Sequence, residues 1–218
     1  MKSTSLTLDG GLPALLLRPP AARLILVLAH GAGSGMNHSF LAALAEDLAA
    51  HGVATLRYEF PYRARGEHRP DKPAVVHAAV RSAVQRADEE GLPMLAGGKS
   101  FGGRMTSQAA ALAPLAGVRG LVLVGFPLHA QGKPPSIARG EHLRDVHLPL
   151  LFLTGTRDEL CDLSLLRPLL HELSPAPTLH VIEGADHSFH VLKRSGLTDA
   201  GVLKDLAGPI AQFGLSLP

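Results

Sequence analysis

The stretch MLAGGKSFGGR, residues 94–104, decides the fold of this chain. It joins a short apolar run to a helix-like stretch, and Gly98, Ser100 and Gly102 in it fit the pattern G-x-S-x-G. That pattern is typical of a strand-to-helix turn, where glycines are needed because the strand end and the helix start approach too closely for side chains. We therefore expect a nucleophilic serine at a helix N-terminus, where the amide of Phe101 can face a developing oxyanion.

A phosphate-binding loop is the main competing interpretation of the same residues. Gly98, Lys99 and Ser100 also match the end of G-x-x-x-x-G-K-[ST] in the same strand-to-helix setting. The first position of that pattern requires glycine, and the chain has Pro93 there. Proline also removes an amide that a phosphate cradle would use, which disfavours this interpretation.

Composition indicates a single globular α/β domain over residues 1–218, since 46% of the residues are hydrophobic and 18% are charged. The net charge of +2 is too small to suggest binding of nucleic acid. Aromatic residues make up 4% of the chain and tryptophan is missing, so few side chains could stack on bases. We expect no nucleic-acid partner.

Cysteine content and hydropathy bear on the compartment. Cys161 is the single cysteine, so no intrachain disulfide can form, and we expect it to be a small buried hydrophobe. The N-terminal residues 1–10 lack an apolar signal core, and the early apolar run 24–29 is too short to span a bilayer. These features favour a cytosolic protein with no membrane partner.

Apolar strands alternate with helical patterns along the rest of the chain. We expect strands at 24–29, 53–58, 94–97, 118–124, 148–153 and 178–182, and helices near 40–48, 74–90, 101–112, 163–173 (kinked or restarted at Pro168) and 200–213. An N-terminal hairpin should come first, over 3–17, with its turn at Asp9-Gly10-Gly11. This order predicts a mostly parallel sheet covered on both faces by helices. The segments 60–72 and 127–145 are expected as loops, and the second is too short for a cap domain.

An acid and a base follow the last two expected strands. Asp158 comes after 148–153 and His187 after 178–182, and reactive groups in such sheets lie on loops at the carboxyl ends of strands. The chain order Ser100, Asp158, His187 is that of an α/β-hydrolase triad. His187 would then take the proton of the Ser100 hydroxyl, and Asp158 would orient the imidazole and stabilise its charged form.

Other residues compete for these roles. Glu159 and Asp186 are the nearest alternatives for the acid, and Asp162 is expected to cap the helix near 163–173. His190, three residues past His187, could replace it as the base or form an H-x-x-H metal pair. The pair has no companion ligand cluster, so we expect no metal.

The second oxyanion donor should lie in the turn after the first buried strand, His30-Gly31-Ala32-Gly33. Its glycines allow the backbone to curl toward the serine turn, so that the amide of Ala32, or that of Gly33, pairs with the amide of Phe101. His30 is expected to hydrogen-bond within the turn. This chemistry requires no cofactor.

Several motifs together resemble one family. They are residues 97–104, His30-Gly31-Ala32-Gly33, Phe60-Pro61-Tyr62, Gly125-Phe126-Pro127-Leu128-His129 with Gly132-Lys133-Pro134, and Gly155-Thr156-Arg157-Asp158. Over most of its length the chain is similar to the small lidless α/β-hydrolases that include testis-expressed and NSL-complex subunit proteins. The resemblance implies the α/β-hydrolase fold without a full cap domain and a triad of Ser100, Asp158 and His187. It implies no particular substrate, and some relatives act as complex subunits.

These observations predict a serine hydrolase, an esterase or thioesterase for a small acyl substrate, with short chains preferred because a cleft without a cap buries few methylenes. The alternative is a catalytically silent binding or complex-subunit protein with the same fold. The oligomeric state is not predicted. Basic residues occur on both expected loops, at Arg63, Arg65, Arg69, Lys72, Lys133, Arg139 and Arg144. We expect solvated loop charges there, although any that converge would suit an acidic substrate.

Overall fold

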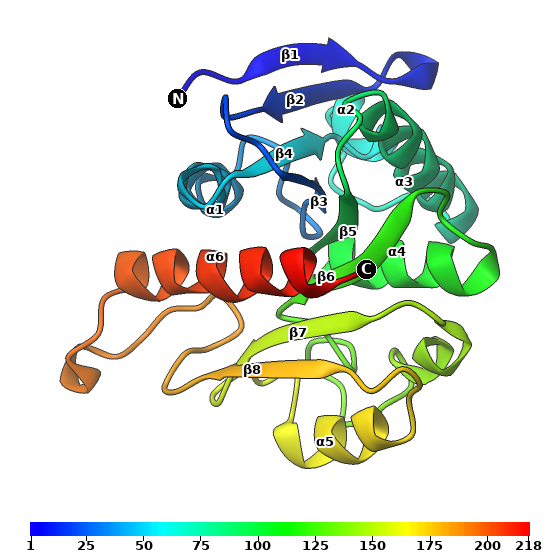
Figure 1. The fold of residues 1–218 in the computed structure, drawn as a ribbon. Helices are drawn as coiled ribbons and strands as arrows, with labels where there is room; N and C mark the ends of the chain where they lie inside the picture. Colours follow the sequence, from blue (N-terminus) through cyan, green and yellow to red (C-terminus); the bar gives the residue numbers. More distant parts are fainter.

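The computed structural model describes residues 1–218 and contains one sheet of eight strands, in the order β1-β2-β4-β3-β5-β6-β7-β8 (Figure 1). The strands are β1 Thr4–Thr7, β2 Pro13–Leu17, β3 Leu24–Ala29, β4 Val53–Tyr58, β5 Met94–Lys99, β6 Val118–Val124, β7 Leu150–Gly155 and β8 Thr178–Ile182. All neighbouring pairs from β4 to β8 are parallel, and only β2 runs against the others. The prediction of a mostly parallel sheet is confirmed.

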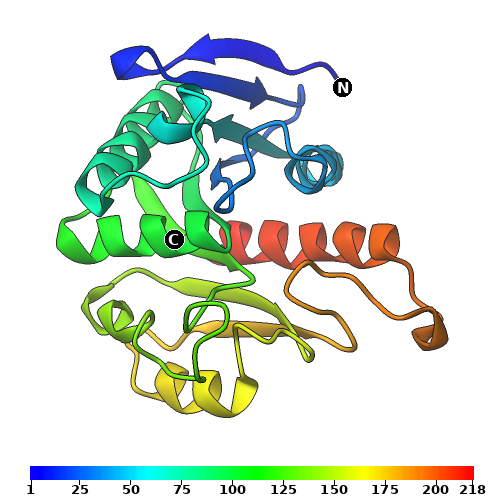
Figure 2. The same cartoon turned by 180° about the vertical axis from the view of Figure 1, so that it is seen from behind.

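Helices cover both faces of the sheet. They are α1 Ser39–Ala50, α2 Pro61–Ala64, α3 Pro73–Asp88, α4 Phe101–Leu112, α5 Leu163–His171 and α6 Asp199–Ser216, with short 3₁₀ turns at Asp9–Gly11, Glu141–Asp145 and Lys193–Ser195. Figure 1 shows α6 crossing one face, and Figure 2 shows α3, α4 and α5 on the other. No helix of the chain combines the length and the apolar character that a membrane span requires.

The central strands are apolar throughout because both of their faces are buried. All six residues of β3 are buried. Side chains alternate across a strand, so Ile25 and Val27 join the core under α3, α4 and α5, while Leu26 and Leu28 join the core under α1 and α6. Two separate apolar cores therefore fix the sheet between its helical layers.

The expected elements are present, with a few differences at their ends. The loop 60–72 contains the short helix α2, which begins at Pro61 because proline has the φ angle of a first helical residue. β7 begins at Leu150 rather than at 148, since Pro149 cannot donate a ladder hydrogen bond. α5 runs through Pro168 as one helix instead of restarting there, and ends at His171.

The segment between β6 and β7 forms no cap domain. Its one regular element is the 3₁₀ turn Glu141–Asp145, which packs against α4 through the hydrogen bond between Ser107 Oγ and His142 Nε2, 2.8 Å. Pro127, Gln131 and Arg139 of the same segment lie around the start of α4, where they line one cavity with Ser100, and the segment adds no layer of helices there.

The turn between β5 and α4 is packed backbone against backbone. A Cβ atom at Gly97 would collide with the carbonyl oxygen of Val122 on β6, and one at Gly102 would lie 2.6 Å from the carbonyl oxygens of Ala29 and His30. Side chains at these positions would push α4 and β6 away from the centre of the sheet.

We expect Gly97→Ala to lower the free energy of unfolding by about 3 kcal/mol, since the added methyl has to displace the backbone of a central strand. Gly10→Ala is the matched control, because Gly10 has open space around it and only its φ of 79° is unfavourable for alanine. That variant should cost about 1 kcal/mol. Urea denaturation of both variants measures the difference, and equal costs would show that the backbone contact at Gly97 is not a constraint.

Candidate active site

Ser100 occupies the turn between β5 and α4 in a strained conformation, with φ 52° and ψ −113°. A non-glycine residue keeps such angles only where its surroundings fix them. Here the Ser100 amide donates a hydrogen bond to the carbonyl oxygen of Val124, 2.8 Å, and its own carbonyl oxygen accepts from the amide of Arg104, 3.1 Å. The side chain is thereby held at the end of the sheet, where it lines a cavity of about 690 Å³.

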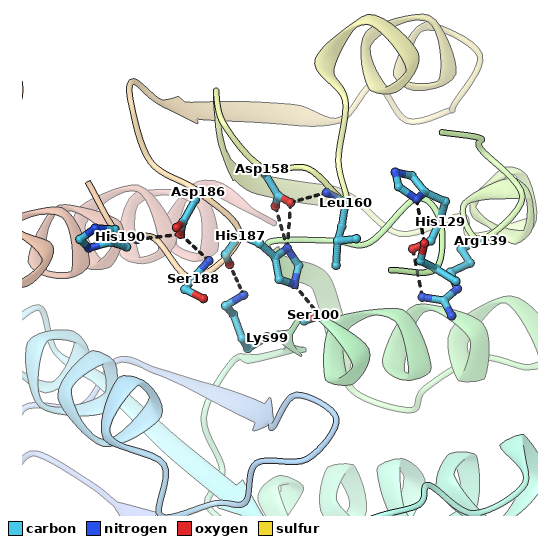
Figure 3. A network of polar contacts seen from close by, with 11 residues as sticks. Lys99, Ser100, His129, Arg139, Asp158, Leu160, Asp186, His187, Ser188 and His190 are labelled. Atoms are coloured by element: carbon cyan, nitrogen blue, oxygen red, sulfur yellow. Dashed lines mark hydrogen bonds and ion pairs between the residues drawn. The ribbon is translucent and has the colours of Figure 1, made fainter. Parts of the chain in front are cut away.

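The structure brings Ser100, His187 and Asp158 together (Figure 3). The Nε2 atom of His187 lies 2.9 Å from Ser100 Oγ, and its Nδ1 atom lies 2.9 Å from each carboxylate oxygen of Asp158. His187 and Asp158 come from the loops after β8 and β7, which are neighbouring strands. The order of the sheet therefore places both side chains beside the serine turn.

The carboxylate of Asp158 is held by hydrogen bonds to the Leu160 amide and to the ring of His187. The Asp158 side chain is fully buried, and its Oδ1 atom accepts a hydrogen bond from the amide of Leu160, 2.9 Å. A buried carboxylate is costly unless its oxygens are hydrogen-bonded, and the ring of His187 supplies the remaining donor. With Nδ1–H donated to Asp158, Nε2 is free to accept the proton of the Ser100 hydroxyl.

Lys99 supports the loop that carries His187. Its ammonium donates a hydrogen bond to the carbonyl oxygen of His187, 2.6 Å, and lies 5.8 Å from the ring centre of Phe40 and 5.4 Å from that of Phe189. Burial lowers the pKa of Lys99 to about 8. Sequence reasoning gave Lys99 no role, because nothing in the pattern G-x-S-x-G shows where the second residue points.

The turn after β3 lies beside Ser100 as expected. His30 Nδ1 lies 2.8 Å from the carbonyl oxygen of Gly31, and its Nε2 accepts the amide of Phe60, 3.1 Å. The expectation that His30 bonds within the turn is confirmed, and the ring also ties the turn to the start of the segment 60–72. Ala32 and Phe101 both line the cavity. Phe101 is the first residue of α4, so its N–H has no partner within the helix.

The residues that competed for the roles of acid and base have other surroundings or partners. Glu159 is exposed, and Asp186 accepts the amides of Ser188 and His190 across its own turn. The ring of His190 pairs with Asp199, 2.8 Å.

Two expectations about neighbouring residues are confirmed. Asp162 caps α5 by accepting the amide of Ser164, 2.8 Å. Cys161 is buried, and burial raises the pKa of its thiol to about 12.

No group of three or more His, Cys, Asp or Glu side chains in residues 1–218 has the arrangement of a metal site.

Two of the seven basic residues on the two loops form ion pairs with acidic side chains. Arg65 binds Glu67 and Asp71, and Arg144 binds Glu172. Arg139 is different, since it lines the cavity.

Arg104 also lines the cavity, and sequence reasoning missed it as a site residue. The signal that could have found it is its spacing, because a residue four positions after Ser100 lies on the same face of α4.

Comparison with known proteins adds independent findings. A family model described as "Alpha/beta hydrolase domain" matches residues 22–214. Among solved structures, a dienelactone hydrolase from Anabaena variabilis is similar with a TM-score of 0.78 and 23% identity, covering 99% of this chain and 98% of that chain. A serine hydrolase without lid from Xanthomonas campestris has a TM-score of 0.72 and 24% identity, covering 100% and 96%. Est1E from Butyrivibrio proteoclasticus, solved with ferulic acid, has a TM-score of 0.74 and 17% identity, covering 97% and 98%. At these identities the three structures show a shared fold.

Lys99 should make stability depend on pH in the alkaline range. Its pKa falls from 10.5 to about 8 on folding, so between these pH values the unfolded chain binds more protons than the folded one. The free energy of unfolding should therefore rise with pH through this window, and the cost of burying the charge should be greatest below pH 8.

The variant Lys99→Met keeps the aliphatic packing and removes the titration. Urea denaturation between pH 7 and pH 10.5 should show the wild type gaining stability relative to Lys99→Met. Lys204→Met, at an exposed position on α6, controls for the loss of one positive charge. A constant difference between wild type and Lys99→Met over this range would contradict the assignment.

Proposed function

Since the chain belongs to the alpha/beta hydrolase domain family, we propose that it is a serine hydrolase, a carboxylesterase or thioesterase that acts on a small acyl substrate. The observation that carries this proposal is the hydrogen-bonded series from Ser100 Oγ through His187 to Asp158, each contact at 2.9 Å. This is the arrangement that activates a serine hydroxyl as a nucleophile.

The proposed reaction has two halves. Ser100 Oγ attacks the carbonyl carbon of the substrate while His187 Nε2 takes its proton, and His187 then gives that proton to the departing alcohol or thiol. Water repeats the sequence on the acyl-serine, with His187 again as base, and releases the acid. The oxygen that becomes negative in each half would be stabilised by the backbone amides of Ala32 and Phe101.

The absence of a large cap supports short acyl groups as substrates. Residues from 60–72 and 127–145 form the rim of the cavity, and neither segment supplies a layer of apolar helices above it. Each further methylene adds about 0.8 kcal/mol only where it is buried, so long chains should gain little.

The finer family relationship is also a proposal. The motifs shared with testis-expressed and NSL-complex subunit proteins, among them the turn His30-Gly31-Ala32-Gly33, support membership of that lidless group. A silent complex subunit would have no use for a buried Asp158 that contacts an imidazole beside a strained serine, which favours the enzyme.

We expect Ser100 to react with a fluorophosphonate probe and the Ser100→Ala variant to remain unlabelled, because an activated serine is the group that such probes modify. Ser188→Ala is the matched control, since Ser188 is exposed and lines the same cavity. It should label like the wild type. Mass spectrometry of the modified peptide decides the outcome, and an adduct on a serine other than Ser100 would exclude Ser100 as the nucleophile.

Asp158→Asn should preserve the fold and lower ester turnover by about 10⁴-fold, as when a triad imidazole loses its orienting carboxylate. Asp162→Asn is the control, because asparagine also caps helices and Asp162 contacts only the start of α5. Rates on a nitrophenyl acetate, with circular dichroism to check folding, give the comparison. A loss below about tenfold would move the acidic role to Glu159 or Asp186.

A further inference from the structure

Arg104 lies one helical turn after Ser100, on the same face of α4. Its amide donates to the Ser100 carbonyl oxygen, 3.1 Å, and its side chain lines the cavity that contains the Ser100 hydroxyl. The guanidinium group packs over the ring of Phe101, 5.5 Å from the ring centre. A group bound by Arg104 would therefore sit beside the carbonyl that Ser100 attacks.

The charge of Arg104 has no acidic partner. The arginine ion pairs of this chain belong to other residues: Arg18, Arg65, Arg86 and Arg144. The Nε atom of Arg104 is buried and lacks a hydrogen-bond partner. An unpaired, partly buried cation is costly to a fold, so its presence at a cavity wall needs an explanation.

The neighbours of Arg104 increase this cost. The charge of Arg139 is close enough to add to the effect of burial in lowering the pKa of Arg104 to about 10. His142 gives no negative charge, since burial and the charge of Arg104 lower its pKa to about 4 and leave it neutral at pH 7. Burial likewise lowers the pKa of His77.

The cavity as a whole is cationic. Lys99, Arg104 and Arg139 line it, and its one acidic residue, Asp71, is already paired with Arg65 at 2.7 Å. Arg139 is fixed in place, because its amide donates to the carbonyl oxygen of Leu128 and its guanidinium donates to that of His129, 3.1 Å. Figure 3 shows Arg139 on the far side of Ser100 from His190.

We propose that Arg104 and Arg139 form an anion subsite that holds a carboxylate of the ester substrate, so that the substrate class is that of carboxylate-bearing esters or thioesters. This inference rests on the proposed function and extends it. A carboxylate supplies two oxygens to two planar donor groups and relieves their mutual repulsion. The carboxylate could belong to the acyl or to the alcohol portion, and the two arms of the test distinguish these sources.

The test compares matched pairs of esters. In the acyl arm, mono-nitrophenyl adipate is compared with its methyl ester, which has the same chain and no charge. In the alcohol arm, 5-acetoxypentanoate is compared with its methyl ester, with acetate release as the readout. We expect the wild-type kcat/KM to favour the anion in one arm by about 10- to 100-fold, the usual effect of hydrogen bonds to a charged group.

Arg104→Gln and Arg139→Gln should each remove most of that preference. Arg104→Lys should retain only part of it, since an ammonium lacks the planar fork. Arg144→Gln is the control, because Arg144 pairs with Glu172 away from the cavity, and it should keep the wild-type preference. Equal rates for anionic and neutral esters in both arms, or an unchanged preference in the two glutamine variants, would overturn the subsite.

A binding experiment separates this inference from the proposed function. Titration calorimetry of adipate into the Ser100→Ala protein requires no catalysis. Saturable binding that is weakened at least tenfold by Arg104→Gln, with inorganic phosphate binding more weakly than adipate, supports the subsite even if no ester is hydrolysed. No binding of adipate, or tighter binding of phosphate, overturns the carboxylate assignment whatever the esterase assays show.

Discussion

The close backbone contact between the start of α4 and the strands β3 and β5 is the constraint on which the rest of the site depends. Where Gly98 and Gly102 meet the carbonyl oxygen of Ala29, no side chain fits. The chain has to turn sharply between β5 and α4, which forces Ser100 to a φ of 52°. This strain is held by two central strands in a closely packed core, and the fixed backbone keeps the hydroxyl in one place.

The order of the strands in the sheet places Asp158 and His187 beside Ser100. The carboxyl ends of parallel strands meet at one edge, so the loops after β7 and β8 deliver Asp158 and His187 to the same side of the serine turn. Their contacts are mutually dependent. Burial of the Asp158 carboxylate would cost much free energy without the hydrogen bonds from His187 and the Leu160 amide. The loop of His187 is in turn held by the hydrogen bond from Lys99.

The same geometry places residues of α4 at the cavity. Phe101 at the start of α4 and Arg104 one turn later both line the cavity. Because Ser100 precedes α4 directly and Arg104 lies within it, the serine and the cation keep a constant separation. Under the proposed function, this separation suits a substrate with a charged group a few bonds from its ester carbonyl. The 3₁₀ turn Glu141–Asp145 packs against α4 through His142, whose pKa is lowered by burial and by the charge of Arg104, and it adds no negative charge beside that arginine.

Much of this structure was determined by local sequence. Apolar runs such as 24–29 can only be buried strands, the glycines around Ser100 permit one kind of turn, and Asp162 precedes a helix that it caps. Order along the chain then sufficed to propose Ser100, Asp158 and His187, because parallel strands bring their following loops to one edge. The helix α2 and the start of β7 were missed or misplaced, since single prolines set those ends.

Only the tertiary structure decided which polar groups share the cavity. Lys99 is the neighbour of Ser100 in the sequence, yet its role depends on the carbonyl oxygen of His187, far along the chain. Among the basic loop residues, Arg65 and Arg144 form ion pairs with carboxylates, while the charge of Arg139 lies close enough to Arg104 to lower its pKa. Sequence patterns report local conformation and burial, whereas the partner of a charge is set by packing between distant segments, and that packing exists only in the folded chain.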